Sequence, residues 1–210
     1  LQNDANASAL AEWRYGAGKG TRNMIFLTFG TGLGAGLILD GKLYAGTNDM
    51  AGEAGHISLS EFGPAGYGKV GSFEGFCSGG GLAQLGRTYA EEALGRGIRP
   101  AYYPDDGDLL KITAKSVAEA AFAGDGTALE VYGVCGAMLG RGLAVLVDLL
   151  NPEMIVLGSI FARSGALLRE PMEEEMKKRA LARSLAVCRV EPAALGDAIG
   201  DYAALAAAEV

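Results

Sequence analysis

The sequence predicts an α/β fold in which helices cover a mixed sheet, and three observations support this prediction. Short β-rich apolar runs at 23–29 and 34–39, with a further run at 42–44, indicate an antiparallel meander. Three long helical patterns lie between residues 79 and 150. Beyond them strand and helix patterns alternate, which is typical of a sheet layered with helices.

Each element has its own signal in the sequence. Residues 5–16 carry helix-forming Ala, Leu and Glu and end at the glycine-rich turn AGKG. The segment 127–150 is apolar on most faces, which predicts a buried central helix, and Asn151-Pro152 ends it. The run MIVL at 154–157 predicts a short buried strand. The remaining expected elements are helices over 79–96, 113–123, 164–180 and 196–208 and a strand over 187–191.

The composition limits the possible functions. The 210 residues carry a net charge of −7, half are hydrophobic and 20% are charged, which is typical of a globular protein with one sizeable core. The acidic balance argues against broad contact with nucleic-acid phosphates. No uninterrupted apolar run reaches the roughly 18 residues that a membrane-spanning helix needs. Cys77, Cys135 and Cys188 form neither a CxxC pair nor a disulfide framework, so we expect a reducing, cytoplasmic location.

The turn between the first two strands, FGTGLG at 29–34, is the first candidate binding site. Gly30 and Gly32 would let backbone N–H groups approach an anion, and Thr31 adds a hydroxyl donor. This chemistry suits a phosphate. The segment is neither a Walker P-loop, because GK[ST] is missing, nor a dinucleotide fingerprint, because no helix follows it. The alternative is a purely structural turn between two strands.

A second glycine position follows the strand predicted at 154–157. Gly158 and Ser159 would allow a nucleotide to lie against the carboxyl edge of the sheet, where α/β folds bind their ligands. The alternative interpretation is a turn that leads into a helix, with Ser159 as its cap. The sequence alone does not decide between these two interpretations.

The candidate catalytic and sugar-binding residues are polar side chains near the N-terminus and in the glycine-rich segment 47–75. Asn3 and Asp4 precede a helix, so Asp4 is either a helix cap or a general base that accepts a proton from a sugar hydroxyl. Glycine-rich segments such as 47–75 are more often functional loops than linkers in a compact domain. The side chains that could bind vicinal hydroxyls there are Glu53, His56 and Glu74. A single histidine is more often structural.

Four segments occur in the order and spacing of one known family. NDANASALAEW resembles the NDANAAALGE stretch of the ROK family (repressor, open reading frame, kinase). The run LTFGTGLGAGLILDGKLYAGTNDMAGEAGHISL is similar to the family pattern GTGxGxGxxxxGxxxxGxxxxAGExGH. NPEMIVLGSIFARSG resembles NPExIVLGGG, and ALGDAIGDYAALAAA resembles ALGDDAGxxGAAxLA. The resemblance covers nearly the whole chain.

The resemblance implies an actin-like, hexokinase-type ATPase lobe of the ribonuclease H-like class. It implies ATP-dependent phosphorylation of a hexose or an N-acetylated amino sugar, with Mg²⁺ and ATP as cofactors and Asp4 as the catalytic base. The implied sugar ligands are Asn3, Asp4, Glu53, His56 and Glu74. The implied nucleotide ligands are Gly30, Thr31, Gly32 and Gly158.

The same resemblance implies that residues 1–210 are a C-terminal lobe, because in the family a first lobe with a DxGGT loop precedes the position of Asn3. We expect a homodimer whose ligands are a sugar and ATP, without nucleic acid at this domain and without a membrane. An alternative is a sugar-sensing transcriptional regulator, since some ROK members carry a DNA-binding segment ahead of this domain. A third is a binding protein without turnover.

One segment departs from the family pattern. GPAGYGKVGSFEG occupies the place of the zinc segment CxCGxxGCxE, and Ala65, Tyr67 and Ser72 stand where the family has cysteines. His56 therefore has no thiolate partners, so the usual Cys₃His tetrahedral zinc site cannot form. Glu74 is retained. We expect no metal site and no structural zinc in this chain.

Overall fold

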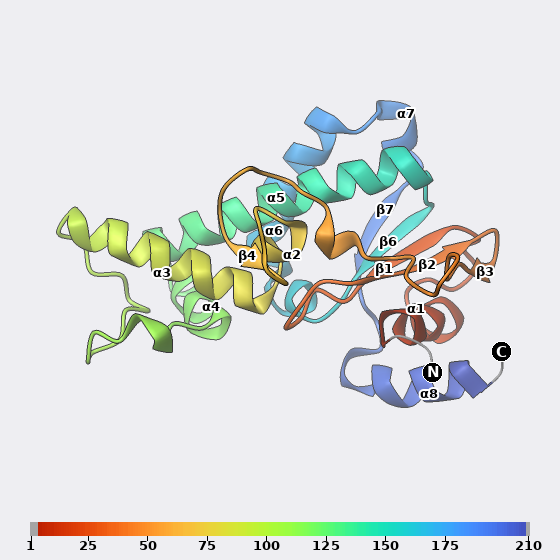
Figure 1. Cartoon of the computed structure of the whole chain (residues 1–210), viewed down its shortest axis with the longest axis horizontal. Coiled ribbons are helices and arrows are strands. Elements are labelled where there is room, and N and C mark those ends of the chain that lie inside the picture. Colours follow the sequence, from red (N-terminus) through yellow and green to blue (C-terminus); the bar gives the residue numbers. More distant parts are fainter. Residues whose placement is uncertain (1–3, 209–210) are drawn as a thin grey trace.

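The computed structural model describes residues 4–208 and contains a five-stranded mixed sheet (Figure 1). The strands are β1 (Met24–Leu27), β2 (Ala35–Leu39), β3 (Lys42–Leu43), β6 (Met154–Leu157) and β7 (Arg189–Pro192). Their order across the sheet is β3-β2-β1-β6-β7. The first three form the expected antiparallel meander, whereas β6 is parallel to β1 and β7 is parallel to β6. The predicted mixed sheet is confirmed.

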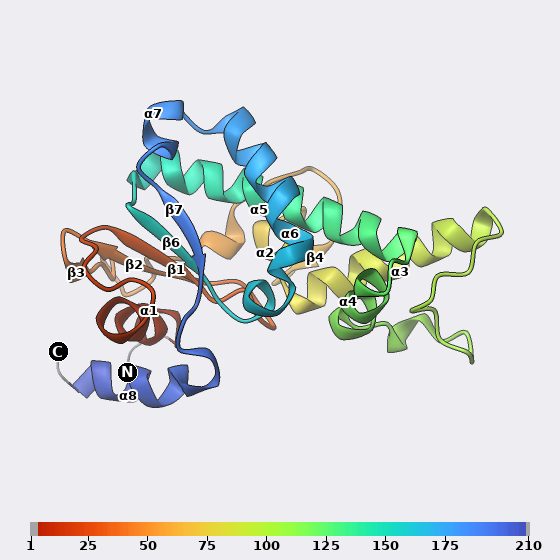
Figure 2. The same cartoon turned by 180° about the vertical axis from the view of Figure 1, so that it is seen from behind.

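Helices cover both faces of the sheet. The helices are α1 (Asp4–Tyr15), α2 (Phe73–Phe76), α3 (Gly79–Gly95), α4 (Ala114–Phe122), α5 (Gly126–Leu150), α6 (Ile160–Arg179), α7 (Ala182–Leu185) and α8 (Ile199–Ala208). Helices α1 and α8 lie side by side on one face, and α5 and α6 pack against the other (Figures 1 and 2). Helices α3 and α4 extend past the end of the sheet.

Alternate residues of the central strands serve two separate cores. Ile25 and Leu27 point toward α5 and α6, whereas Met24 and Phe26 pack with residues of α1 and α8. All four residues of β1 and all four of β6 are buried. Such continuous apolar strands are expected where helices cover a sheet on both faces.

Helix α5 is long and apolar enough, by length and composition, to cross a membrane. More than half of its most apolar stretch is buried inside the protein, however, and its residues form the centre of the larger core. The helix ends at Asn151, which adopts a left-handed φ of 44° as a C-cap. The predicted buried central helix is confirmed.

The glycine-rich segment before α3 contains more regular structure than we predicted. It carries a 3₁₀ turn, η1 (Ala54–His56), a hairpin of β4 (Ala65–Gly66) and β5 (Lys69–Val70), and the short helix α2. Tyr67 and Gly68 form the hairpin turn, with φ of 46° and 76°. Strands of two residues are too short to give a periodic signal, so the sequence pattern could not reveal them. Two further 3₁₀ turns are η2 (Leu109–Lys111) and η3 (Gly196–Ala198).

Helix α6 also differs from the prediction, because it begins at Ile160 rather than at residue 164. Ser164 has non-helical dihedral angles and kinks the helix, which explains why the start is hard to recognise from sequence. Pro171 lies inside the same helix. The early start places the first turn of α6 directly behind Gly158, at the end of β6.

Candidate active site

Two of the predicted glycine positions meet at one edge of the sheet. Because β1 and β6 are parallel, the turn after β1 and the turn at Gly158 both leave the same carboxyl edge. The Gly158 amide donates to the Leu27 carbonyl at 2.9 Å, and the Ile160 amide donates to the Phe29 carbonyl at 2.9 Å. These bonds join the FGTGLG turn to the start of α6. Carboxyl edges of this kind are common ligand sites in α/β folds.

Hydrogen bonds close the neck of the FGTGLG turn. The Thr28 amide donates to the Gly34 carbonyl at 2.9 Å, and the Gly34 amide donates to Thr28 Oγ1 at 2.9 Å. Inside the turn the Gly30 amide donates to the Gly32 carbonyl at 3.0 Å. Thr31 is exposed at its tip. Thr28 was not singled out from the sequence, since a threonine in a β-rich run gives no signal of its own.

A second helix terminus approaches the same turn. The Gly79 amide, at the start of α3, donates to the Gly30 carbonyl at 2.7 Å. A β-carbon added at Gly79 would lie 3.3 Å from that oxygen, so the two segments are in close contact. Ser78 caps α3 by accepting from the Gly81 amide at 3.0 Å. The turn is therefore supported by the ends of both α3 and α6.

An open groove runs beside the turn. A cavity of about 390 Å³ is bounded by Gly30 and Thr31, and its charged lining comes from Lys115 and Arg163. A neighbouring cavity of about 560 Å³ is bounded by Gly158, shares Arg163 with the first and is also lined by Asp197. The smaller cavity, which has cations and glycine backbone but no carboxylate in its lining, suits an anionic ligand. The two basic residues come from α4 and α6. Arg163 lies in the segment NPEMIVLGSIFARSG but beyond the part that matches NPExIVLGGG, and Lys115 lies in none of the four segments, so neither was predicted from the sequence.

Ser159 has a different role from the helix cap that we considered as an alternative. It occupies the position before α6, but its side chain makes no capping hydrogen bond to the backbone. Its Oγ instead accepts from Arg163 Nη2 at 3.1 Å. Its φ of 41° is unusual for a residue other than glycine, and the corresponding position of the family segment is glycine. Strained positions of this kind often occur at ligand sites.

Glu74 lies against the turn rather than apart from it. Its Oε2 accepts a hydrogen bond from the Leu33 amide at 2.9 Å. Gly55, in η1, packs closely against both Leu33 and Glu74. A β-carbon added at Gly55 would lie 2.2 Å from the Leu33 carbonyl oxygen and 3.2 Å from Glu74 Cβ. Glu53 and His56 flank Gly55 and are exposed. The structure therefore places Glu74 at the phosphate-type turn, and the backbone of η1 between Glu53 and His56 packs against both.

Asp4 immediately precedes a residue that packs beside the end of the same turn. It is the first residue of α1 in the described part of the chain, and it is exposed. The neighbouring Ala5 packs against the strand that follows the turn. A β-carbon added at Gly36 would lie 2.5 Å from the Ala5 carbonyl oxygen, and one added at Gly34 would lie 3.6 Å from Ala5 Cβ. Asn3 lies outside the described residues.

The segment that departs from the family's zinc pattern is stabilised by ordinary hydrogen bonds. Gln84 of α3 binds both backbone groups of Ala65, accepting from its amide at 3.0 Å and donating to its carbonyl at 2.9 Å. Ser72 is buried and caps α2 by accepting from the Gly75 amide. The His56 ring makes an edge contact with Tyr67, with ring centres 5.3 Å apart. Between residues 4 and 208, no three His, Cys, Asp or Glu side chains group as a potential metal site.

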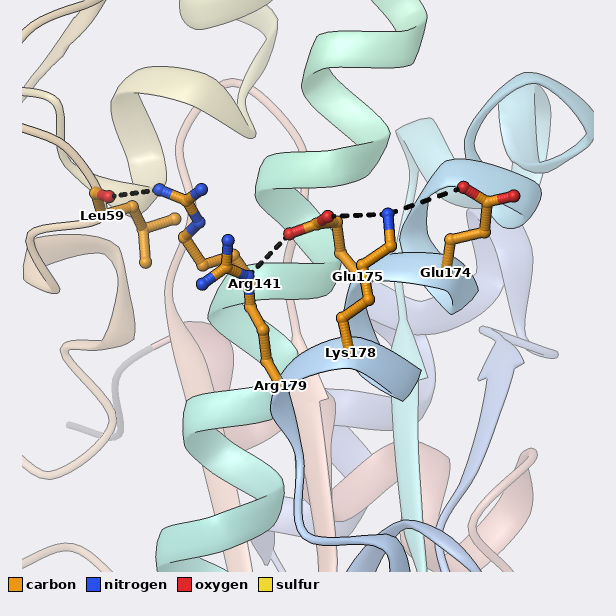
Figure 3. Close-up of polar contacts among 6 residues, drawn as sticks. All are labelled: Leu59, Arg141, Glu174, Glu175, Lys178 and Arg179. Atoms are coloured by element: carbon orange, nitrogen blue, oxygen red, sulfur yellow. Dashed lines mark hydrogen bonds and ion pairs between the residues drawn. The ribbon is translucent and has the colours of Figure 1, made fainter.

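Arg141 connects this segment to the central helix. Its Nη1 donates to the Leu59 carbonyl at 3.0 Å, while its Nε is buried without a hydrogen-bond partner (Figure 3). On the adjacent helix α6, Glu175 accepts from Arg179 at 2.6 Å and pairs with Lys178 at 3.3 Å. The α6 ion pairs are near the surface and contribute little stability. Arg141 is the residue that ties the segment to α5.

The cysteines do not replace the missing zinc ligands. Burial raises the pKa of the Cys77 thiol well above its usual value, so it stays protonated at neutral pH. Its Sγ donates to the Cys135 carbonyl at 3.6 Å. Burial likewise raises the pKa of Cys188 to about 11. Cys77 and Cys135 are both buried, and no cysteine between residues 4 and 208 groups with two further potential metal ligands.

The sheet order, the two-sided helical cover and the turn at the carboxyl edge define an actin-like ATPase lobe of the hexokinase type. The model of the ROK family matches residues 1–209, and the chain belongs to that family. The recognised family resemblance and the expected fold are therefore confirmed.

Both kinases and regulators are among the relatives. The glucokinase of Halalkalibacterium halodurans is 37% identical over 202 residues, which are 95% of this chain and 60% of the relative. The xylose repressor of Caldicellulosiruptor bescii is 29% identical over 198 residues, covering 94% of this chain and 48% of the relative. The chain thus spans about half to three fifths of the length of these curated relatives.

Solved structures show the same mixture. A ROK family glucokinase from Streptomyces griseus, crystallised with glucose and AMPPNP, superposes with a TM-score of 0.83 at 32% identity, covering 97% of this chain and 66% of that chain. A ROK family transcriptional regulator described as a homolog of the E. coli MLC protein superposes with a TM-score of 0.81 at 26% identity, covering 98% and 50%. The fold is therefore common to members with different functions.

Proposed function

We propose that the protein containing this chain phosphorylates a hexose or an N-acetylated amino sugar with ATP. The observation that carries the proposal is the contact of Glu74 with the Leu33 amide, which joins the sugar-type acceptors to the phosphate-type turn at one edge of the sheet. Glucokinases at 31–37% identity support a sugar kinase activity.

In the proposed reaction, Asp4 accepts the proton of a sugar hydroxyl as that oxygen attacks the γ-phosphorus of ATP. The sugar would be oriented by Asn3, Glu53, His56 and Glu74. The Gly32 amide and the Thr31 hydroxyl would bind phosphate oxygens. Gly30 would shape the turn through its bond to the Gly32 carbonyl, and Gly158 would leave space for the nucleotide. The products are a sugar phosphate and ADP.

Magnesium is the cofactor expected with ATP, and the chain's residues fit it in a limited way. Mg²⁺ is usually bound through substrate phosphates, waters and one or two carboxylates, so it needs no dedicated cage of acidic residues. Asp4 is an exposed carboxylate beside the turn. Bound Mg²⁺ would neutralise phosphate charge; the protein residues position the phosphates and the sugar. We further propose a cytoplasmic homodimer that contacts neither nucleic acid nor membrane through this domain.

The test incubates the full-length protein with Mg²⁺, ATP and each member of a panel of hexoses and N-acetylated amino sugars. The ADP and the sugar phosphate that form are both measured. Asp4→Asn should lower kcat by at least about 10²-fold, because the general base is lost, while sugar affinity changes much less. Folded Asp4→Asn protein with near-normal kcat would contradict the assignment of the base.

The second candidate function is that of a sugar-sensing transcriptional regulator. It is favoured by the repressor relatives and by the regulator of known structure that superposes on 98% of this chain. A regulator would bind a sugar and change its affinity for a DNA operator without producing ADP. Sugar binding with no ATP-dependent product for any member of the panel would favour this function over the kinase.

A further inference from the structure

We propose that Glu74 is also a positioning residue for the phosphate-binding turn, so that one carboxylate links the sugar site to the nucleotide site. The inference rests on the proposed kinase function and extends it. The family resemblance assigns Glu74 to the sugar alone. The structure adds a direct contact with the turn, because Oε2 accepts from the Leu33 amide at 2.9 Å.

The carboxylate has one bound oxygen and one available oxygen. Within residues 4–208, Oε1 accepts no hydrogen bond, whereas Oε2 is bonded to the turn. The carboxylate also lies against Gly32, where an added β-carbon would come within 2.8 Å of Oε2. Glu74 is half-buried, so a sugar hydroxyl could reach the available oxygen. The two contacts need not compete, since they use different atoms.

The backbone of Glu74 is held in place by its neighbours. The preceding Phe73 is fully buried and packs so closely on α5 that a β-carbon at Gly142 would lie 2.4 Å from its ring. Ser72 caps the same helix. Gly55 contacts Glu74 on the side of η1. Helix α2 therefore presents the carboxylate from a rigid position, as an element that positions a loop requires.

The consequence is a coupling between the two substrates. A sugar hydroxyl on Oε1 would restrict the Glu74 side chain and so favour the bond to the Leu33 amide. A turn that is already ordered binds phosphate at a smaller entropic cost. By thermodynamic reciprocity, a bound nucleotide must then favour sugar binding by the same factor. The sugar would thus act on nucleotide affinity without touching the nucleotide.

The experiment measures the Kd of AMPPNP with Mg²⁺ by calorimetry in the full-length protein, first without sugar. Glu74→Ala should weaken nucleotide binding by about tenfold, because the turn loses a charged acceptor. Glu74→Gln should weaken it by only about twofold to threefold, because the amide oxygen can still accept. Glu61→Ala is the matched control: Glu61 is an exposed carboxylate of the neighbouring loop with no side-chain hydrogen bond or ion pair in the described structure, and its loss should leave this Kd unchanged.

The same variants are then titrated in the presence of a saturating sugar that the wild type phosphorylates. The wild type and Glu61→Ala should bind AMPPNP several-fold more tightly with sugar than without it, whereas Glu74→Ala should show no such gain. Hydrogen exchange of the Leu33 amide provides a second measurement, and it should accelerate in Glu74→Ala but not in Glu61→Ala.

The inference is overturned if the wild type and Glu74→Ala bind AMPPNP equally well without sugar and the Leu33 amide exchanges at the same rate in both. Glu74 would then be a sugar ligand only. If Glu74→Ala does not fold, Glu74→Gln and its Leu33 exchange decide the question. Failure of the kinase proposal is recognised separately: the wild type would form no sugar phosphate, while Leu33 exchange would still report whether Glu74 orders the turn.

Discussion

Two segments lie on either side of Glu74, and they are stabilised in different ways. The turn at 28–34 is bonded to the first turns of α2 and α3: the Leu33 amide donates to Glu74, and the Gly30 carbonyl accepts from the Gly79 amide. The segment at 57–72 is closed by its own backbone, since Gly71 bonds to Leu59, Ser60 and Pro64. It is also held by the side chains of Gln84 and Arg141. The first segment matches its family motif, whereas the second departs from it.

The glycines have different roles in the two segments. At Gly30 and Gly34 an added β-carbon would meet no atom closer than 3.4 Å, so these positions leave room beside the turn for a ligand. Gly71 instead has a left-handed φ of 65°, and an added β-carbon there would lie 2.1 Å from the Ser60 carbonyl oxygen. The second segment is therefore stabilised by its own packing and by hydrogen bonds to side chains of α3 and α5, and not by the thiolate ligands of the family pattern.

The largest effect is expected for a substitution in the turn at 28–34. Gly32→Val should lower kcat/KM for ATP by at least about 10²-fold, because even the first added carbon would lie 2.8 Å from Glu74 Oε2 and the branched side chain would obstruct phosphate. Gly95→Val is the control, since an added β-carbon there meets no atom within 4 Å. Steady-state kinetics and AMPPNP calorimetry check the prediction; normal values for both would remove the turn from the site.

A smaller effect is expected where α2 packs on the central helix. Gly142→Ala should lower the free energy of unfolding by about 1–2 kcal/mol, because its β-carbon would overlap the Phe73 ring and overpacking exceeds the gain in helix propensity. Gly133→Ala, in the same helix, meets open space and should be neutral or raise stability by up to about 1 kcal/mol. Urea denaturation of both variants measures the difference, and equal stabilities would show that α2 shifts freely.

A substitution that affects the segment at 57–72 should have a weaker effect still. Gln84→Ala removes two hydrogen bonds to Ala65 and should lower the free energy of unfolding by about 1 kcal/mol, with kcat/KM for ATP changing by less than threefold. Glu91→Ala, on an exposed position of the same helix, is the control. A loss of nucleotide use as large as that of Gly32→Val would mean that the two segments are not independent.

The sequence predicted the parts of the fold that follow from periodic patterns. The meander, the buried strand at 154–157 and the central helix were all found from apolar spacing, and the FGTGLG turn was found from its glycines. The β4–β5 hairpin was missed because its strands are two residues long. The start of α6 was placed too late because Ser164 interrupts the helical geometry.

The candidate site was predictable only in part, for a related reason. Asp4, Glu53, His56 and Glu74 lie in segments that match a motif, and the structure places Glu74 in direct contact with the turn. Lys115 and Arg163 come from separate helices and meet at the groove only through tertiary packing, so no local pattern marks them. The bond between Glu74 and Leu33 spans 41 positions and is equally invisible in the sequence.

The smallest effect is predicted for zinc removal: incubation with a strong chelator should leave the melting temperature and kcat unchanged. A structural zinc site normally needs four ligands, and this segment offers His56 with Ala65 and Ser72 at two of the cysteine positions. Ser72 instead caps α2, and Ala65 is bound by Gln84.

Elemental analysis of protein purified without metal-affinity steps should accordingly find far less than one zinc per chain. A matched comparison is Gln84→Ala, which should lower the melting temperature under the same conditions although it removes no possible metal ligand. Cys77 is fully buried and its thiol donates to the Cys135 carbonyl, and a His56-Cys77 pair would still lack two protein ligands. Stoichiometric zinc whose removal unfolds the segment would show that a metal, and not the side chains of α3 and α5, stabilises the sugar side of the site.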